Sequence, residues 1–191
     1  RRLSFSLEKI INVTNIPISI DTWKNEVAEY ALNLGASIIN DIYGLKKDKK
    51  LAATIAKYNA GVIIMHNNDN RTYNNGLIPE IIKSLKESID IALISGISKD
   101  KIFIDPGIGF AKDPEQNIEV MKNLFQLTKL GYPLLLGVSR KSVIGSVINV
   151  PPKERLPATI ASTVMGIIQG YEIFRVHDVK ENLQAAIFTD K

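Results

Sequence analysis

Hydrophobic side chains recur along the chain with two different spacings, and the two spacings alternate. Short, mainly apolar runs are typical of strands buried on both faces, and they occupy residues 18–20, 36–39, 61–66, 102–104, 133–138 and 172–176. Between these runs, apolar residues return every three or four positions, as they do in a helix that packs one face against a core. Helices are therefore expected within residues 1–15, 22–34, 51–58, 78–93, 113–125, 158–168 and 178–191.

Several of these helices carry start signals. Thr22 precedes the second helix and can cap its first turn. Asp113 with Gln116, and Asp178 with Glu181, have the spacing of a capping box, in which two side chains satisfy each other's backbone amides. We therefore expect side-chain caps at all three positions.

Strict alternation of strand and helix favours parallel strands joined by right-handed crossovers. Polar residues follow each strand at its carboxyl end, where the loops of a TIM (β/α)8 barrel build their site. A doubly wound sheet is the competing architecture, but no glycine-rich dinucleotide loop is present. We expect one α/β domain over residues 1–191, a TIM barrel with about six βα units that lacks its first two strands and their loops.

Composition adds bounds to this picture. The chain has 191 residues, 45% hydrophobic and 23% charged, which is ordinary for one globular core. It has no cysteine, which excludes disulfides and thiolate metal sites, and no apolar run as long as a membrane span. A cytoplasmic protein is therefore expected. The net charge of +4 favours anionic ligands, but it is spread along the chain and supports nucleic-acid binding little.

Three polar residues stand at the ends of three different predicted strands: Asp21, Asn40 and Asp105. Carboxylate and amide groups at one edge of a sheet suit the donor-rich edge of a flat heterocycle. Each residue could instead cap a helix. Capping is a good explanation for any one of the three residues, but a poor one for all three together.

A second group is basic. Arg175 and His177 alternate along a predicted strand, so they share a face, and a guanidinium beside an imidazole suits a phosphate or diphosphate. Lys141 also follows a strand and could reach an anion or a ring carbonyl. His66 could line the site or satisfy its own loop, and we favour the loop. No cluster has metal-ligand spacing, so any metal would be held mainly by its substrate.

In this order and spacing, the strings at the strand ends resemble the dihydropteroate synthase family. The matching strings are Ser19-Ile20-Asp21-Thr22, Ile38-Ile39-Asn40-Asp41-Ile42, Ile64-Met65-His66, Ile104-Asp105-Pro106-Gly107-Ile108-Gly109-Phe110, Leu136-Gly137-Val138-Ser139-Arg140-Lys141-Ser142 and Arg175-Val176-His177-Asp178.

The resemblance implies roles for individual residues. A pterin would be held by Asp21, Asn40, Ile42, Met65, Asp105, Gly137 and Lys141. A p-aminobenzoate site, where sulfonamides compete, would be bordered by Phe110, Ser139 and Lys141. The leaving diphosphate would be taken by Arg175 and His177. The catalytic set would be Asp105, Lys141, Arg175 and His177.

The implied protein is a transferase of folate biosynthesis. It would condense 6-hydroxymethyl-7,8-dihydropterin diphosphate with p-aminobenzoate to give 7,8-dihydropteroate and diphosphate. The resemblance also implies Mg²⁺, with its protein ligand in the missing amino-terminal strand, and a homodimer. Two alternatives stay open: a pterin-binding methyltransferase domain, which has no use for the bases Arg175 and His177, and a pterin-binding fragment without turnover.

Overall fold

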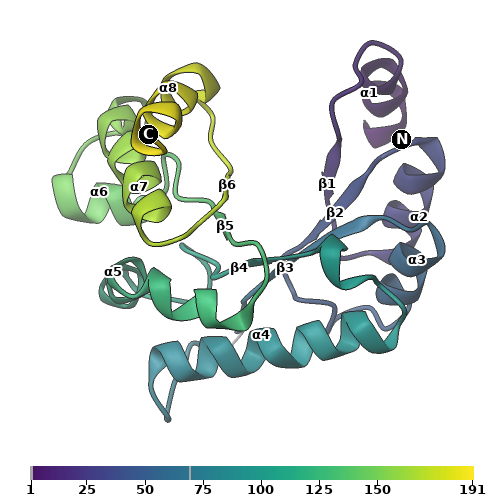
Figure 1. Cartoon of the computed structure of the whole chain (residues 1–191), viewed down its shortest axis with the longest axis horizontal. Coiled ribbons are helices and arrows are strands. Elements are labelled where there is room, and N and C mark those ends of the chain that lie inside the picture. Colours follow the sequence, from purple (N-terminus) through teal and green to yellow (C-terminus); the bar gives the residue numbers. More distant parts are fainter. Residues whose placement is uncertain (1, 69) are drawn as a thin grey trace. The chain divides into compact units, whose positions relative to one another are not determined.

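The computed structural model describes residues 2–68 and 70–191, and strands alternate with helices along it (Figure 1). Its strands are β1 (Ser19–Asp21), β2 (Ile38–Asp41), β3 (Gly61–Met65), β4 (Ile102–Asp105), β5 (Leu135–Leu136) and β6 (Ile173–Phe174). Its α-helices are α1 (Arg2–Ile11), α2 (Asn25–Leu34), α3 (Leu51–Lys57), α4 (Leu77–Ile94), α5 (Pro114–Lys122), α6 (Ser142–Ile148), α7 (Leu156–Ile168) and α8 (Val179–Thr189). The helix expected within residues 1–15 is α1, and Arg1 lies outside the described residues.

The chain divides into two compact units. Unit 1 holds the described residues up to Met65 together with Ser84–Phe103, and unit 2 holds His66–Lys83, without Asp69, together with Ile104–Lys191. The predicted organisation as a single domain stays a prediction.

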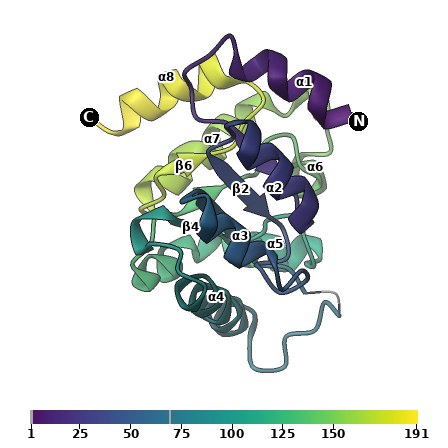
Figure 2. The ribbon, with the colours of Figure 1, turned by 90° about the vertical axis from the view of Figure 1, so that its right-hand side faces the viewer.

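Unit 1 is built on parallel strands. Strand β1 pairs with β2 and β2 with β3, and β4 stands next to β3 in the strand order. Every residue of β3 is buried, as its uninterrupted apolar run predicts. Helices α2 and α3 pack against each other, as Figures 1 and 2 show, and isoleucines from β2 and α3 fill the core without exposed surface.

Unit 2 continues the same parallel pattern. Ile104, at the end of β4, bridges to Leu134, and β5 pairs in parallel with β6, so three strand ends lie side by side. The two last strands are shorter than predicted. Pro133 has no N–H to donate to a ladder, and beyond Leu136 the chain bends into the loop of the candidate site. Helices α7 and α8 pack closely on each other (Figures 1 and 2).

The helix caps divide into one confirmed prediction and two wrong ones. Asp113 and Gln116 form the expected capping box, with bonds of 2.8 and 3.0 Å. Asp178 does not cap α8, because its carboxylate accepts two bonds from the Arg140 guanidinium instead. Thr22 does not cap α2 either: its hydroxyl accepts from the amide of Lys24, one residue before the helix begins.

Helix α6, over Ser142–Ile148, is absent from the helices that the sequence pattern predicts. A signal was nevertheless present: Val143, Ile144 and Val147 have helical spacing, and the first two are buried.

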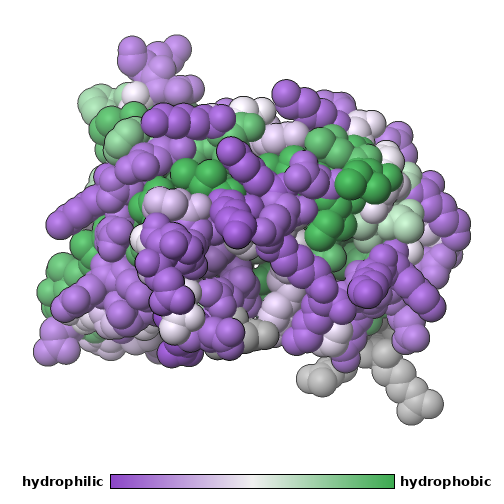
Figure 3. Space-filling model, turned by 90° about the horizontal axis from the view of Figure 1, so that it is seen from below, coloured by the Kyte–Doolittle hydropathy of each residue, from purple (hydrophilic) through white to green (hydrophobic). Residues whose placement is uncertain are grey.

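The surface carries apolar side chains among charged ones. Figure 3 shows one face on which hydrophilic residues predominate and hydrophobic ones gather in separate patches. Among the described residues, no helix is long and apolar enough to cross a bilayer.

Candidate functional site

The candidate residues of unit 1 lie at the carboxyl ends of its strands. Asp21 and Asn40 are register partners on β1 and β2, and the amide that follows Asp21 donates to the Asn40 carbonyl oxygen at 3.1 Å. Asp21 is exposed and Asn40 is buried. Ile42 is half-buried, and Met65, the last residue of β3, is 1% exposed.

Asp41, beside Asn40, serves its own turn. Its carboxylate accepts from the amides of Tyr43 at 2.9 Å and Leu45 at 2.7 Å. Burial raises the pKa of this carboxyl, while the two amide bonds act in the opposite direction. The side chain is therefore committed to the loop after β2.

Asp105 is the centre of the candidate site in unit 2. It ends β4, only 1% of it is exposed, and a buried carboxylate needs partners. Its Oδ1 accepts from the Gly107 amide at 2.7 Å, and its Oδ2 accepts from Arg175 Nη2 at 3.0 Å. Arg175 reaches it across Gly137, where a Cβ atom would lie 3.0 Å from that same guanidinium nitrogen. The glycine at 137 therefore leaves room for the ion pair.

Lys141 approaches the same carboxylate from the loop after β5. Its Nζ donates to the Ile108 carbonyl at 2.5 Å and lies 4.9 Å from the centre of the Phe110 ring. Burial lowers the pKa of this lysine, Asp105 raises it and Arg175 lowers it. The structure thus brings Lys141 and Phe110 together at the end of the glycine loop that follows β4.

Ser139 and His177 form a neighbouring pair. The Ser139 Oγ atom lies 2.9 Å from His177 Nδ1 and accepts from the His177 backbone amide at 3.2 Å. The hydroxyl can donate to Nδ1 or accept from it, according to the tautomer of the ring. Ser139 therefore orients the imidazole of His177.

Two arginines, neither expected from the sequence, hold the loop that bears Lys141. Arg140 has a left-handed φ of 58°, and its Nε and Nη2 atoms donate to the two carboxylate oxygens of Asp178. Arg155 Nη1 donates to the carbonyls of Arg140 at 2.9 Å and Lys141 at 3.0 Å. Arg155 gives no sequence signal of this kind, because its partners are backbone carbonyls, and the partner of Arg140 lies 38 residues away in sequence.

His66 does more than satisfy its own loop. Its amide donates to the Asp105 carbonyl at 2.9 Å, and its Nδ1 lies 3.1 Å from Lys112 Nζ. Lys112 itself was not expected in the site, although it is buried beside Asp105.

No group of three His, Asp or Glu side chains able to hold a metal ion occurs in the part of the chain that the structure describes. These residues alone therefore do not make a metal site.

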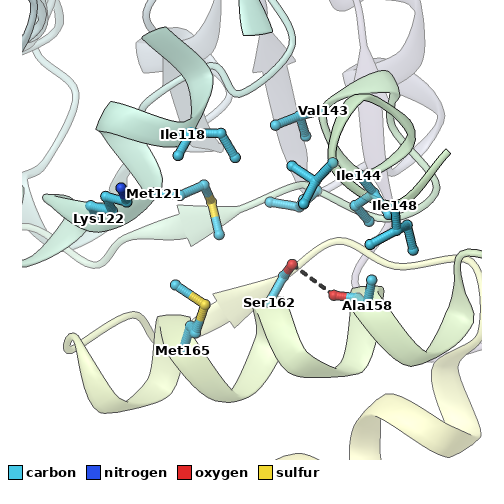
Figure 4. A pocket seen from close by; sticks show the side chains of 11 residues that line it. Ile118, Met121, Lys122, Val143, Ile144, Ile148, Ala158, Ser162 and Met165 are labelled. Carbon is cyan, nitrogen blue, oxygen red and sulfur yellow. Dashed lines mark hydrogen bonds between the residues drawn. The ribbon is translucent and has the colours of Figure 1, made fainter. Parts of the chain in front are cut away.

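A different kind of cavity, about 210 Å³, lies between α5, α6 and α7 of unit 2 (Figure 4). Ile118, Met121 and Met165 line it together with side chains of α6, and Ser162 turns its hydroxyl to the Ala158 carbonyl of its own helix at 2.8 Å. Apart from Lys122 and Ser162 the lining side chains are apolar, and the charged groups of the Asp105 cluster are not among them.

Residues 1–177 match the family model of the pterin binding enzymes, and the chain belongs to that family. It is similar to dihydropteroate synthases. The protein of that name from Clostridium beijerinckii is 52% identical over 177 residues, which cover 92% of this chain and 65% of the relative. The chain thus spans about two-thirds of the length of the curated relatives that it matches.

Solved structures agree with this assignment. The dihydropteroate synthase of Clostridium difficile, crystallised in the presence of pteroic acid, has a TM-score of 0.98 and 54% identity, with 100% of this chain and 72% of that chain covered. The Yersinia pestis enzyme in a sulfonamide drug complex has a TM-score of 0.93 and 33% identity, with 99% and 71% covered. The chain is therefore an α/β protein with the fold of these TIM-barrel enzymes.

Proposed function

We propose that this chain carries the pterin and diphosphate sites of a dihydropteroate synthase, a transferase of folate biosynthesis. The reaction joins 6-hydroxymethyl-7,8-dihydropterin diphosphate to p-aminobenzoate, giving 7,8-dihydropteroate and diphosphate. The likeness to dihydropteroate synthases at 52% and 54% identity supports this choice within the family.

One observation carries the proposal: a nearly inaccessible carboxylate lies among cations. Asp105 bonds Arg175, and Lys141 lies close enough for its pKa to respond to both of them. The carboxylate can accept from the N–H groups at the edge of a pterin ring. The cations next to it can stabilise the negative charge that develops on a departing diphosphate. In unit 1, Asp21 and Asn40 supply a further acceptor and an amide for the same class of ligand.

The bond changes follow from these roles. The bond between the pterin methylene carbon and the diphosphate oxygen breaks, and its electron pair leaves with the diphosphate. Arg175 and His177, whose ring is oriented by Ser139, stabilise that negative charge. The amine of p-aminobenzoate, placed against Phe110 and Lys141, then attacks the methylene carbon and releases one proton. Asp105 favours the positive charge that the pterin carries between the two events.

The ligands named for two relatives fit this assignment. Pteroic acid, present with the Clostridium difficile protein, joins a pterin to p-aminobenzoate, and the sulfonamide bound to the Yersinia pestis protein mimics the second half. We propose that sulfonamides compete at Phe110, Ser139 and Lys141 here.

Mg²⁺ and a homodimer are part of the proposal. The described residues do not themselves fit a metal site, so the ion would be bound mainly by the diphosphate. Exposed apolar side chains on α7 and α8 of unit 2, Ile168 at 74% and Phe188 at 85%, support self-association. Light scattering of wild type and Phe188→Glu tests the dimer: a monomer in the variant supports it, and a monomer in both excludes it.

A turnover assay tests the activity. The chain is incubated with the pterin diphosphate and p-aminobenzoate, with and without Mg²⁺, and 7,8-dihydropteroate is measured. Product that a sulfonamide suppresses supports the proposal. Binding of the pterin without product would leave a non-catalytic binding fragment. Methyl transfer from a methylated pterin donor would indicate the methyltransferase alternative.

A further inference from the structure

Lys112 lies two residues beyond the glycine loop Gly107–Phe110 and is only 7% exposed, although lysine is rarely buried. None of the roles proposed above uses it. Its neighbour Ala111 has a left-handed φ of 51°, and the Ala111 carbonyl accepts from the Tyr73 hydroxyl at 2.7 Å. The chain is thus bent so that the lysine side chain turns back under the loop.

The Lys112 ammonium has three partners within hydrogen-bond distance. Its Nζ lies 3.0 Å from the Gly107 carbonyl, 3.1 Å from the Phe110 carbonyl and 3.1 Å from His66 Nδ1. A charged ammonium has three N–H donors and fills all three partners, whereas a neutral amine has two. The charged form makes His66 Nδ1 an acceptor, whereas a neutral amine keeps this contact only where the imidazole proton lies on Nδ1.

The loop itself depends on side chains for its shape. Gly107 and Gly109 have left-handed φ values of 71° and 81°, which few residues other than glycine adopt. The Gly107 amide bonds Asp105, and the Gly109 amide bonds Asn117 Oδ1 at 2.6 Å. Lys112 joins the first and last carbonyls of the loop, so it fixes the distance between Asp105 and the Phe110 ring.

Lys141 takes another carbonyl of the loop, that of Ile108, but its role differs. Lys141 has further N–H donors with which it can bind a substrate, whereas the three donors of Lys112 are filled by the loop and His66. We propose that Lys112 is a positioning residue: its ammonium holds Gly107–Phe110 in the conformation that presents Asp105 and Phe110 to the ligand, without touching the ligand itself. The ligand named here rests on the proposed function, whereas the hold on the loop does not.

The charged and titratable groups around Lys112 make this hold sensitive to pH. Asp105 faces it from β4, His66 from the end of β3, and Lys141 from the loop after β5. Burial lowers the pKa of Lys112 to about 7, with Asp105 acting against this and Lys141 adding to it. With His66 Nδ1 as the acceptor, one of the three bonds of Lys112 should be lost as the pH rises past neutrality.

The first test needs no activity. Nuclear magnetic resonance follows the lysine Cε resonances and the amides of Gly107–Phe110 in the full chain between about pH 6 and about pH 8.5. One lysine should titrate near neutrality, and the loop amides should move with the same midpoint. In Lys112→Arg, whose guanidinium stays charged, both changes should disappear. Loop amides that stay fixed while Lys112 titrates would overturn the proposal.

The second test measures pteroic acid affinity in wild type, Lys112→Arg, Lys112→Met and the exposed control Lys129→Met. Loss of a charge-assisted bond should weaken binding about tenfold in Lys112→Met, and the control should change by less than about twofold. Between about pH 6 and about pH 8.5, the affinity of wild type for pteroic acid should fall by about fivefold relative to that of Lys112→Arg. Equal pH profiles in these two proteins would contradict the proposal. If Lys112→Met does not fold, the wild-type profile and the loop amides decide.

The two tests separate this inference from the proposed function. If the loop amides titrate with Lys112 but the wild-type chain does not bind pteroic acid, the proposed function is refuted and the role of Lys112 is upheld. If the chain binds pteroic acid but its loop amides do not titrate with Lys112, the function is supported and the role of Lys112 is refuted.

Discussion

The loops after β4 and β5 each bring a lysine to Asp105, and the two lysines are held in opposite ways. Lys112 is buried, and its ammonium is filled by two carbonyls and an imidazole nitrogen. Lys141 has one backbone partner and lies over an aromatic ring. A lysine thus stabilises the backbone of one loop, whereas in the other loop a lysine remains able to bind a ligand.

The difference shows that one residue of a site can hold the backbone in its conformation while another binds the substrate. A group with every donor filled cannot bind substrate without breaking the loop that it supports, so it contributes rigidity. A lysine with only one backbone bond, such as Lys141, can form new bonds to the substrate. The following predictions test this division, from the largest effect to the smallest.

Asp105→Asn should have the largest effect. The amide keeps the size of the side chain but loses the negative charge that pairs with Arg175 and accepts from the ring. Two charge-assisted bonds correspond to a loss of roughly 100-fold or more in pteroic acid affinity, measured by calorimetry. The exposed control Asp190→Asn should bind as wild type does. Unchanged affinity in Asp105→Asn would remove Asp105 from the site.

Arg175→Gln should discriminate between ligands. A pterin that carries the diphosphate should lose roughly 10- to 100-fold in affinity, because the guanidinium contributes charge to the anion. The bare pterin should lose less, since it meets Asp105 instead. Competition binding with the two ligands measures the ratio, and equal losses would contradict the anion role of Arg175.

Lys112 should make stability depend on pH. Its pKa is lowered from 10.5 to about 7 in the folded chain, so the unfolded chain holds more protons between these values. The cost of burying the charge is present below about pH 7 and is relieved as the pH rises. The free energy of unfolding should therefore increase by about 2 kcal/mol between about pH 7 and about pH 9 relative to Lys112→Met, as denaturant titration can measure. Parallel pH profiles would show that Lys112 does not titrate there.

Tyr171 is buried as Lys112 is, but its polar group lacks hydrogen bonds of the kind that Lys112 makes within the described residues. It is 3% exposed, and its hydroxyl has no hydrogen-bond partner among the described residues. Removing a buried unpaired hydroxyl relieves its desolvation, so Tyr171→Phe should stabilise the chain by about 1 kcal/mol in denaturant titration. A loss of stability would reveal a partner for the hydroxyl in solution.

The sequence predicts local and periodic features well. Alternating apolar runs indicated the parallel α/β arrangement, and the Asp113 box follows from contacts within one turn. It failed where a distant partner competes: Asp178 has the spacing of a cap, but Arg140, far away in sequence, takes its carboxylate.

The candidate site divides in the same way. Asp105, Lys141 and Arg175 could be proposed because strand ends of parallel sheets carry such residues. Lys112 and Arg155 could not, because their partners are mainly backbone carbonyls, which every residue has. Supporting side chains of this kind become visible only in the folded chain.

The most direct test of the account is the carboxyl carbon resonance of Asp105, assigned by its loss in Asp105→Asn and recorded with and without saturating pteroic acid. We expect this resonance to shift on binding, because a ring donor joins or replaces Arg175 at the carboxylate, while that of Asp190 stays in place. A saturated complex in which the Asp105 resonance does not move would contradict the account.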